Sequence, residues 1–426
     1  MRSRRAVLSL GSLVVVSGAL TSACGALPGG GPDRRTVTVW LMRNSASDAF
    51  LARFTKKFED QHPDVRLDIR IQEWTGIGEK VSAALRSKHA AGAPDVIEVG
   101  NTQVPQYVDE GGLLDLSLES ARDLGMADWL PGLAEPGVDK SRQYGIPWYA
   151  ANRVVIYHKG LFAAAGIEKP PRTRDEWLDV THRLDTGGVQ GIYLAGQDWY
   201  TLSGFIWDEG GELAHESSGT WTGALDTPAA LRAMDFYQQL QALGAGPKDA
   251  DEEHPSQAGQ FARGHIAQII SVPGAAQQII DKNPALKGKL GYFPIPGKTA
   301  ARAGAVFTGG SDLVVAAGTG DRAGAVAVVT ALAGKVWNTE LARTMNYVPN
   351  KTTLADAVAD EPGVAAMAVG AAHGKATPAS PLWAKVEAAD NPIKTYMSRV
   401  LSGADPATEA KKASREITRR LDESGA

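Results

Sequence analysis

Apolar and polar positions alternate in two different ways along the first hundred residues. Every second side chain is apolar in 36–40 and again in 65–71, and 95–99 contains three β-branched residues, so these three segments are predicted to be strands. Between them, Phe50, Phe54 and Phe58 repeat at helical spacing in 47–61, which predicts a helix that packs these three rings in the core. A second helix is expected to carry Ile77 and Val81. Strands that alternate with helices are typical of an open α/β sheet with crossover helices.

The ends of these predicted strands carry side chains that can bind a ligand. In open α/β sheets ligands bind beyond the carboxyl ends of the strands. The residues at or just after those ends are Trp40, Asn44, Glu73, Asn101 and Gln103. Each one alone can be an ordinary loop residue, but their recurrence at successive strand ends predicts a binding site.

Residues 144–159, YGIPWYAANRVVIYHK, bring two aromatic side chains to the start of a β-branched run. Trp148 and Tyr149 follow a turn with Gly and Pro, and Arg153 precedes the apolar strand 154–156. Aromatic faces stack on sugar rings while polar neighbours bond the hydroxyls, so these three residues are candidate cleft residues. The alternative is a Trp that simply packs in the core.

A second aromatic stretch, 196–213, interleaves aromatic and acidic residues. Asp198, Trp199, Tyr200 and Trp207 are its candidate ligand contacts, because carboxylates accept hydroxyl protons beside stacking rings. A buried aromatic helix is the alternative. Further candidates are Trp383 and the turn before strand 313–316, which allows close backbone approach and contains Gly309, Gly310 and Ser311.

The remaining segments indicate ordinary structural elements. Residues 175–184 are expected to form a helix with Trp177 on its apolar side, and 261–280 a strand, a Pro-Gly turn and the start of a helix. Residues 322–334 are also expected to be helical. Asp249, Asp251 and Glu253 alternate as in a calcium loop, but the required Gly and Glu are absent, which indicates a solvated acidic loop. The histidines lack zinc-site spacing, so neither a metal nor a cofactor is expected.

The N-terminus has the layout of an export signal. Three arginines precede the apolar segment 6–20, and small residues lead to Cys24, the single cysteine of the chain. We therefore expect residues 1–23 to be a signal peptide and 24–35 a flexible tether rich in Gly and Pro. An ordinary secretory signal with an incidental Cys is the alternative, and both the general and the twin-arginine export routes stay open.

The composition restricts the possible partners. A chain of 426 residues with 43% hydrophobic residues is long enough for two globular domains. Its formal net charge of −4 argues against nucleic acid as a ligand, and one cysteine excludes an internal disulfide.

Several stretches together resemble the bacterial extracellular solute-binding proteins of ABC sugar importers, family 1. The similarity extends from Thr36 nearly to the C-terminus, and its blocks include PDVIEVGNTQ, YGIPWYAANRVVIYHKGLF, FARGHIAQIISVPG, GGSDLVV and YVPNKTTL. LTSAC also resembles the lipobox of bacterial lipoproteins, in which the sulfur corresponding to Cys24 is lipidated.

The resemblance implies a two-lobed, type II periplasmic-binding-protein-like α/β fold that closes on sugar. The crossings between lobes would lie at 144–147, 304–308 and 346–350, which gives an N-lobe of 34–144 plus 305–346 and a C-lobe of 145–304 plus 347–426. It also implies a lipid-anchored monomer on the outer face of the cell membrane that delivers its sugar to permease subunits. Gly274 stands where many relatives place an aromatic residue, so maltose should not be assumed.

Two enzyme classes are the alternatives to a binding protein. A lipid-anchored glycosidase or lyase would use the same cleft, and Glu73, Asp198, Asp208 and Glu209 could supply its carboxylate pair. A dinucleotide enzyme is suggested by a G-x-G-x-x-A string at 318–323, but such strings arise by chance where a helix follows a strand. We therefore expect a binding protein and not an enzyme.

Overall fold

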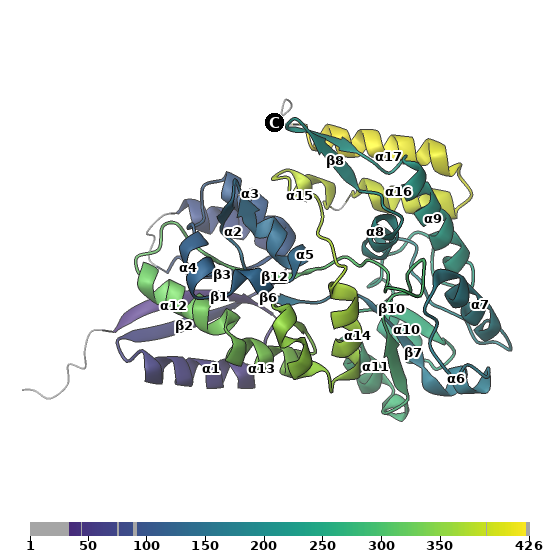
Figure 1. Ribbon diagram of the computed structural model, residues 1–426, viewed down its shortest axis with the longest axis horizontal. Helices are drawn as coiled ribbons and strands as arrows, with labels where there is room; N and C mark the ends of the chain where they lie inside the picture. The colour runs from purple at the N-terminus through teal and green to yellow at the C-terminus, as the bar shows by residue number, and fades with distance from the viewer. Residues whose placement is uncertain (1–33, 44, 75, 88–91, 389, 423–426) are drawn as a thin grey trace, which may run out of the picture.

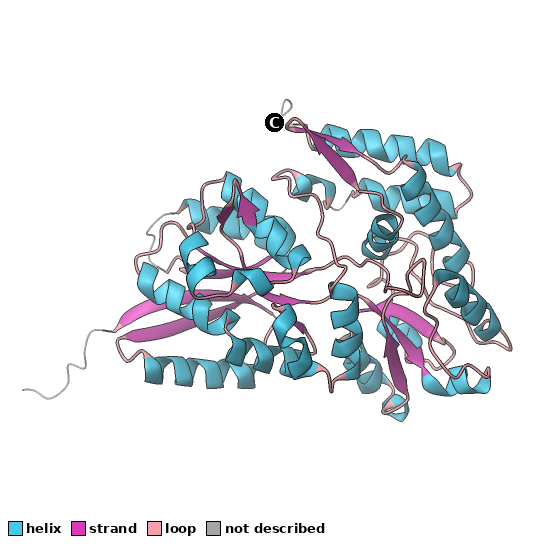
Figure 2. Cartoon of the chain, in the orientation of Figure 1, coloured by secondary structure: helices cyan, strands magenta, loops and turns pink. Residues whose placement is uncertain are grey.

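The computed structural model describes residues 34–43, 45–74, 76–87, 92–388 and 390–422, and it consists of two lobes side by side (Figure 1). Cys24 and most of the predicted tether lie outside these residues. Both lobes are mixed α/β (Figure 2). Within the described part of the chain, no helix is long and apolar enough to cross a membrane.

The N-lobe is built on one six-stranded sheet with the strand order β13-β6-β12-β3-β1-β2. Strand β1 runs parallel to β2 and β3, whereas β12 runs antiparallel to both β3 and β6. The strands are β1 (Arg35–Met42), β2 (Val65–Gln72), β3 (Val96–Gly100), β6 (Ile146–Ala150), β12 (Gly310–Val315) and β13 (Val348–Pro349). A small hairpin of β4 (Val138–Asp139) and β5 (Arg142–Gln143) lies beside it.

Helix α1 shows how the N-lobe sequence specifies its packing. The Ser47 side chain caps its first turn, and Phe50, Phe54 and Phe58 are all buried, which confirms the core role predicted from their spacing. Trp337 meets two of these rings edge-on. The helices of this lobe are α1 (Asp48–Gln61), α2 (Ile77–Arg86), α3 (Val104–Asp109), α4 (Ser117–Arg122), α5 (Pro131–Ala134), α12 (Arg322–Ala333) and α13 (Lys335–Met345).

The C-lobe surrounds a three-stranded antiparallel sheet, β10-β7-β11. Its strands are β7 (Val154–His158), β10 (Gln268–Ser271) and β11 (Leu290–Phe293), with a separate hairpin of β8 (Ala214–Ser217) and β9 (Thr220–Gly223). Its helices are α6 (Lys159–Ala164), α7 (Arg174–Leu184), α8 (Trp199–Asp208), α9 (Pro228–Gln241), α10 (Gln257–Phe261), α11 (Ala275–Lys282), α15 (Trp383–Val386), α16 (Pro392–Leu401) and α17 (Pro406–Arg420).

The helix predicted at 175–184 is α7, and a full capping box between Thr173 and Glu176 begins it. Trp177 is completely buried there, as predicted, and its Nε1 donates to Gln268 Oε1 at 2.9 Å. Phe261, which the sequence pattern placed at the start of a strand segment, instead ends helix α10. Strand β10 begins seven residues later because a loop first returns the chain to the sheet.

Two strands at or beside the predicted crossings, β6 and β13, belong to the N-lobe sheet. Strand β6 pairs with β12 in this sheet, although residues 145–304 are predicted to lie in the C-lobe. Strand β13 pairs with β6, which keeps residues 348–349 in the N-lobe as well. The apolar sequence of these strands predicts that they are buried, but it does not predict which sheet they join.

Helix α14 (Pro362–Ala371) lies between the two lobes (Figure 1). Its side chains Val364 and Met367 share one apolar cluster with Val348 of the N-lobe sheet and with Ile156 and Ile269 of the C-lobe sheet. The two lobes are therefore joined by packing as well as by the passages of the chain.

Candidate binding cleft

A cavity of about 940 Å³ lies where the lobes meet. Its C-lobe walls come from the start of α8, the loop into α10, and the turn between β10 and α11, and its N-lobe wall is the end of α13. Residues bordering it include Arg153, Tyr200, Glu252, Glu253, Gln257, Gly274, Gln277, Gln278, Asn346 and Tyr347. Aromatic, amide, carboxylate and guanidinium groups therefore converge on one space.

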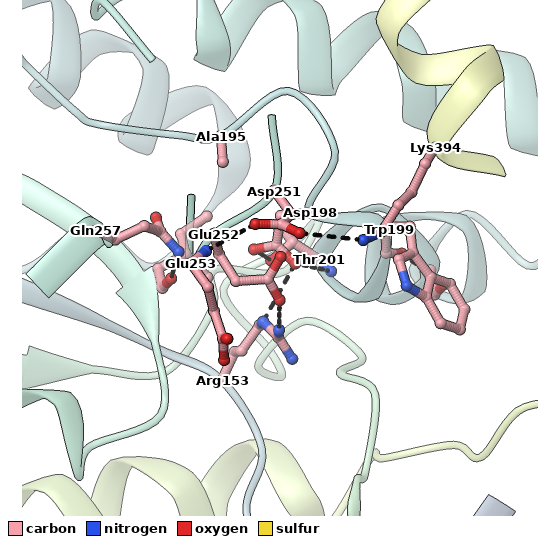
Figure 3. A network of polar contacts seen from close by, with 12 residues as sticks. Arg153, Ala195, Asp198, Trp199, Thr201, Asp251, Glu252, Glu253, Gln257 and Lys394 are labelled. Carbon is pink, nitrogen blue, oxygen red and sulfur yellow. Dashed lines mark hydrogen bonds and ion pairs between the residues drawn. The ribbon is translucent and has the colours of Figure 1, made fainter. Parts of the chain in front are cut away.

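Arg153 is the centre of the charged cluster in this cavity (Figure 3). Its Nε lies 3.2 Å from Asp198 Oδ1, and its Nη2 is hydrogen bonded to Glu252 Oε1. The guanidinium also lies 4.7 Å from the centroid of the Tyr200 ring, close enough for a cation–π contact. Two carboxylates and one ring thus hold a single arginine in place.

Local sequence positions both carboxylates. Asp198 is the N-cap of α8 and accepts from the backbone N of Thr201 at 3.1 Å and from its Oγ1 at 2.6 Å. In the loop before α10, Asp251 accepts from the backbone N of Glu253 at 3.1 Å and forms an ion pair with Lys394 at 3.5 Å. These contacts fix the turn that presents Glu252.

Burial and charge together set the pKa values in this cluster. Burial alone would lower the pKa of Arg153, but the charges of Asp198 and Glu252 raise it above its ordinary value. Burial, together with the charge of Asp198, raises the pKa of Glu252 despite the opposing effect of Arg153. Arg153 therefore stays charged and offers its remaining N–H groups to a polar ligand.

Two tyrosine rings border the cavity from opposite lobes. Tyr200 packs against Phe307 and Trp199, with ring centroids 4.5 and 4.1 Å apart. Tyr347 stacks on Tyr149 at 4.0 Å with an angle of 8° between the ring planes. Each bordering ring is thus supported from behind by another aromatic side chain.

Gln257 presents a buried side-chain carbonyl oxygen beside the cavity. The residue is buried and borders the cavity, and its Nε2 donates to Ile270 O at 3.2 Å. Its Oε1 has no hydrogen-bond partner among the described residues. A buried acceptor of this kind favours a ligand that donates a hydrogen bond.

Glu387 connects the lobes on the side of α15. Its carboxylate accepts from Trp383 Nε1 at 2.8 Å and from Thr102 Oγ1, which belongs to the N-lobe, at 3.5 Å. Burial raises the pKa of Glu387 to about 7, although both hydrogen bonds act in the opposite direction.

We expect Glu387→Gln to remove part of the pH dependence of stability. A raised pKa in the folded state stabilises the protein below pH 4.5, and this contribution is lost as the pH rises through about 7. The free energy of unfolding of the variant should therefore exceed that of the wild type by about 1–3 kcal/mol at pH 8 and by much less at pH 5. Urea unfolding at both pH values checks this. The exposed Glu168→Gln is the control, and it should change the free energy of unfolding equally at pH 5 and pH 8. The same change at both pH values for Glu387→Gln would contradict the prediction.

Comparisons with known proteins agree with this architecture. The family described as bacterial extracellular solute-binding protein matches residues 44–339. The diacetylchitobiose binding protein DasA of Streptomyces coelicolor is 38% identical over 91% of this chain and 90% of its own. The chain belongs to the bacterial extracellular solute-binding proteins.

Solved structures show the same fold at lower identity. The sugar-binding protein MalE of Xanthomonas citri matches with a TM-score of 0.81 at 22% identity, over 91% of this chain and 97% of that one. The GacH receptor of Streptomyces glaucescens matches with a TM-score of 0.74 at 23% identity, over 92% and 99%. The predicted type II periplasmic-binding-protein-like fold is confirmed, and the chain is the substrate-binding component of an ABC importer.

The cleft of this solute-binding protein brings together part of the predicted set. Arg153 and Tyr200 border the cavity, while Asp198 and Trp199 support them from behind. Tyr149 and Ser311 lie beneath Tyr347 in a buried network. Gly310 allows this approach of strands, because a Cβ there would lie 2.1 Å from the Tyr149 carbonyl oxygen.

Other predicted contacts do not border this cavity. Trp148, Trp207 and Trp383 are buried in the lobe cores, and Trp40 lies under Lys80 in the N-lobe core. Asn101 donates to Thr308 O at 3.1 Å, and Ala151 N donates to the carbonyl of Gly309. Glu73 is exposed and paired with Arg43, Gln103 contacts Tyr107, and Asn44 lies outside the described residues.

Sequence reasoning did not single out Glu252, Gln257 or Tyr347, which border this cleft. The loop at 249–253 is not simply a solvated acidic loop, because Glu252 pairs with Arg153. The acidic run itself was the available signal for it. In the described part of the chain, no group of three His, Cys, Asp or Glu side chains could hold a metal ion.

Proposed function

We propose that the cavity binds a sugar of the N-acetylglucosamine disaccharide class. The observation that carries this proposal is the convergence of two supported tyrosine rings and the Arg153 cluster on a cavity of about 940 Å³. This volume lies at the upper end of small-molecule sites. Rings stack on pyranose faces, while Arg153, Glu252 and Gln257 can pair with hydroxyl and acetamido groups.

The similarity to a diacetylchitobiose binding protein supports this choice of sugar. Gly274 supports it further, because a Cβ at this cavity residue would meet no atom within 4 Å. The resulting space accommodates the extra bulk of an acetamido substituent, which an aromatic side chain at this position would occupy.

Binding without hydrolysis is part of the proposal. A glycosidase needs one carboxyl group as acid and a second as base or nucleophile. Here Asp198 is fully buried and held by Thr201 and Arg153, and Glu252 is paired with the same arginine. Both carboxylates are committed to holding Arg153, which favours a ligand-binding role.

The location and the domain division are also proposals. We infer that Cys24 is lipidated at the outer face of the membrane, that 24–35 is the tether, and that the protein is a monomer. The order of residues at 1–24 supports the anchor, and labelling with a fatty acid that is lost in Cys24→Ser tests it. The sheets support an N-lobe of about 34–150 plus 305–350 and a C-lobe formed by the other residues from 151 onward.

Isothermal titration calorimetry of the purified protein with N,N′-diacetylchitobiose tests the proposed function. We expect saturable binding, together with a raised melting temperature, since ligand at one hundred times its Kd stabilises the folded state by about 2.7 kcal/mol. Cellobiose and maltose serve as matched disaccharides without acetamido groups. Binding of all three alike would contradict the choice of sugar, and release of monosaccharide would contradict the binding role.

A further inference from the structure

The N-lobe wall of the cavity ends in a pair of stacked tyrosines. Tyr347 borders the cavity, and its ring lies parallel to Tyr149 at a centroid distance of 4.0 Å. Helix α13 ends just before it, at Asn346, which takes the left-handed conformation that Asn tolerates. This turn, with Tyr347 N donating to Ala342 O at 3.0 Å, brings the ring onto Tyr149.

Tyr149 is held by a buried polar network beneath the cavity. Its hydroxyl lies 3.1 Å from Ser45 Oγ, 3.0 Å from Glu98 Oε1 and 3.0 Å from Ser311 Oγ. These partners come from the loop after β1, from β3 and from β12, so the network spans neighbouring strands of the N-lobe sheet.

Glu98 is the acceptor on which the network converges. The residue is completely buried, yet its carboxylate accepts from Ser45 Oγ at 2.6 Å, from Ser311 Oγ at 2.6 Å and from Met42 N at 2.7 Å. Burying a carboxyl group is costly even when it is hydrogen bonded, and an apolar core would avoid that cost. Phe in place of Tyr149 and an apolar residue in place of Glu98 would also fill this part of the core. Packing alone therefore does not account for the buried polar network.

We propose that Tyr347 is the stacking surface for a sugar ring on the N-lobe wall, and that Tyr149 and Glu98 are positioning residues that act through it. This inference rests on the proposed sugar-binding function of the cavity. A ring that is already fixed before binding loses little freedom when the ligand stacks on it, which strengthens binding without an added contact.

A double-mutant cycle on ligand affinity tests the inference. Calorimetry with N,N′-diacetylchitobiose should give a Kd about tenfold or more higher for Tyr347→Ala, which removes the ring. Tyr149→Phe keeps its own ring but releases the network, and we expect a rise of about three- to tenfold. In the Tyr347→Ala background, Tyr149→Phe should change the Kd less than about twofold, because its effect passes through the missing ring.

Glu98→Gln and Tyr396→Phe complete the experiment. Glu98→Gln replaces one carboxylate oxygen with an NH₂ group, which cannot accept from the hydroxyls that donate to Glu98. It should therefore raise the Kd as Tyr149→Phe does. Tyr396→Phe is the matched control: this buried tyrosine lies in α16, away from the cavity, and its loss of a hydroxyl should leave the Kd unchanged. Near-UV circular dichroism reports the stacked pair, and its signal should change in Glu98→Gln, which keeps both rings, as well as in the Tyr149 and Tyr347 variants.

The outcomes separate the inference from the function on which it rests. If the wild-type protein binds the sugar and Tyr347→Ala binds it equally tightly, the inference is wrong and the proposed function stands. Equal effects of Tyr149→Phe in both backgrounds would show that Tyr149 acts independently of Tyr347, which also overturns it. A wild-type protein that binds no sugar overturns the proposed function, and the inference with it.

Discussion

Replacing Arg153 with Met is expected to destabilise the protein by about 3–5 kcal/mol at pH 8, because it leaves a fully buried Asp198 and a largely buried Glu252 without their cation. The loss should be smaller at pH 5, where Glu252 can take up a proton, since burial and Asp198 already raise its pKa. Sugar affinity should also fall by about tenfold or more, since charge-assisted hydrogen bonds contribute about 1.5–3 kcal/mol. Thermal unfolding at both pH values and calorimetry measure these effects.

The triple variant Arg153→Met, Asp198→Asn, Glu252→Gln is the matched control for stability. It removes the cation and both carboxylate charges together, so no uncompensated charge remains, and most of the lost stability should return. Sugar affinity should stay low in this variant, because the guanidinium is still missing. Equal melting temperatures for Arg153→Met and wild type would show that the cluster is not coupled to stability.

Tyr200→Ala is expected to weaken sugar binding by about 10- to 100-fold while the protein stays folded. The substitution removes a ring that borders the cavity and one face of the cation–π contact that holds Arg153. Calorimetry with the disaccharide measures the loss, and circular dichroism checks the fold.

Tyr200→Phe distinguishes the ring from its hydroxyl. It keeps the stacking surface against Phe307 and Trp199, so its Kd should stay within about threefold of the wild-type value. A Phe variant as weak as the Ala variant would assign the effect to the hydroxyl and would contradict the stacking role.

The order of strands and helices in the first hundred residues follows from hydrophobic period alone, because each element buries side chains that recur at its own spacing. Phe50, Phe54 and Phe58 are an example: spacing predicted their burial, and all three are buried. The orientation of Trp148 and Tyr149 could not be predicted in this way. Strand β6 is buried along its whole length, so alternation places the two side chains on opposite faces without telling which face looks toward the ligand.

The charged part of the cleft was only partly predictable for a different reason. Arg153 and Asp198 stood out because they lie beside aromatic residues in the sequence. Glu252 did not, since its partner Arg153 lies 99 residues earlier in the chain, and only the fold brings them together. Tyr347 likewise becomes a cavity residue through the turn at Asn346, where the sequence predicts only a crossing between the lobes.

The position of β12 has a consequence for the order in which the protein can be made. This strand, residues 310–315, lies between β6 and β3 in the middle of the N-lobe sheet, and β13 at the sheet edge follows only at 348–349. During synthesis, the first 150 residues therefore emerge without the strand that joins their two halves. The N-lobe sheet therefore cannot be completed before most of the C-lobe sequence has been synthesised.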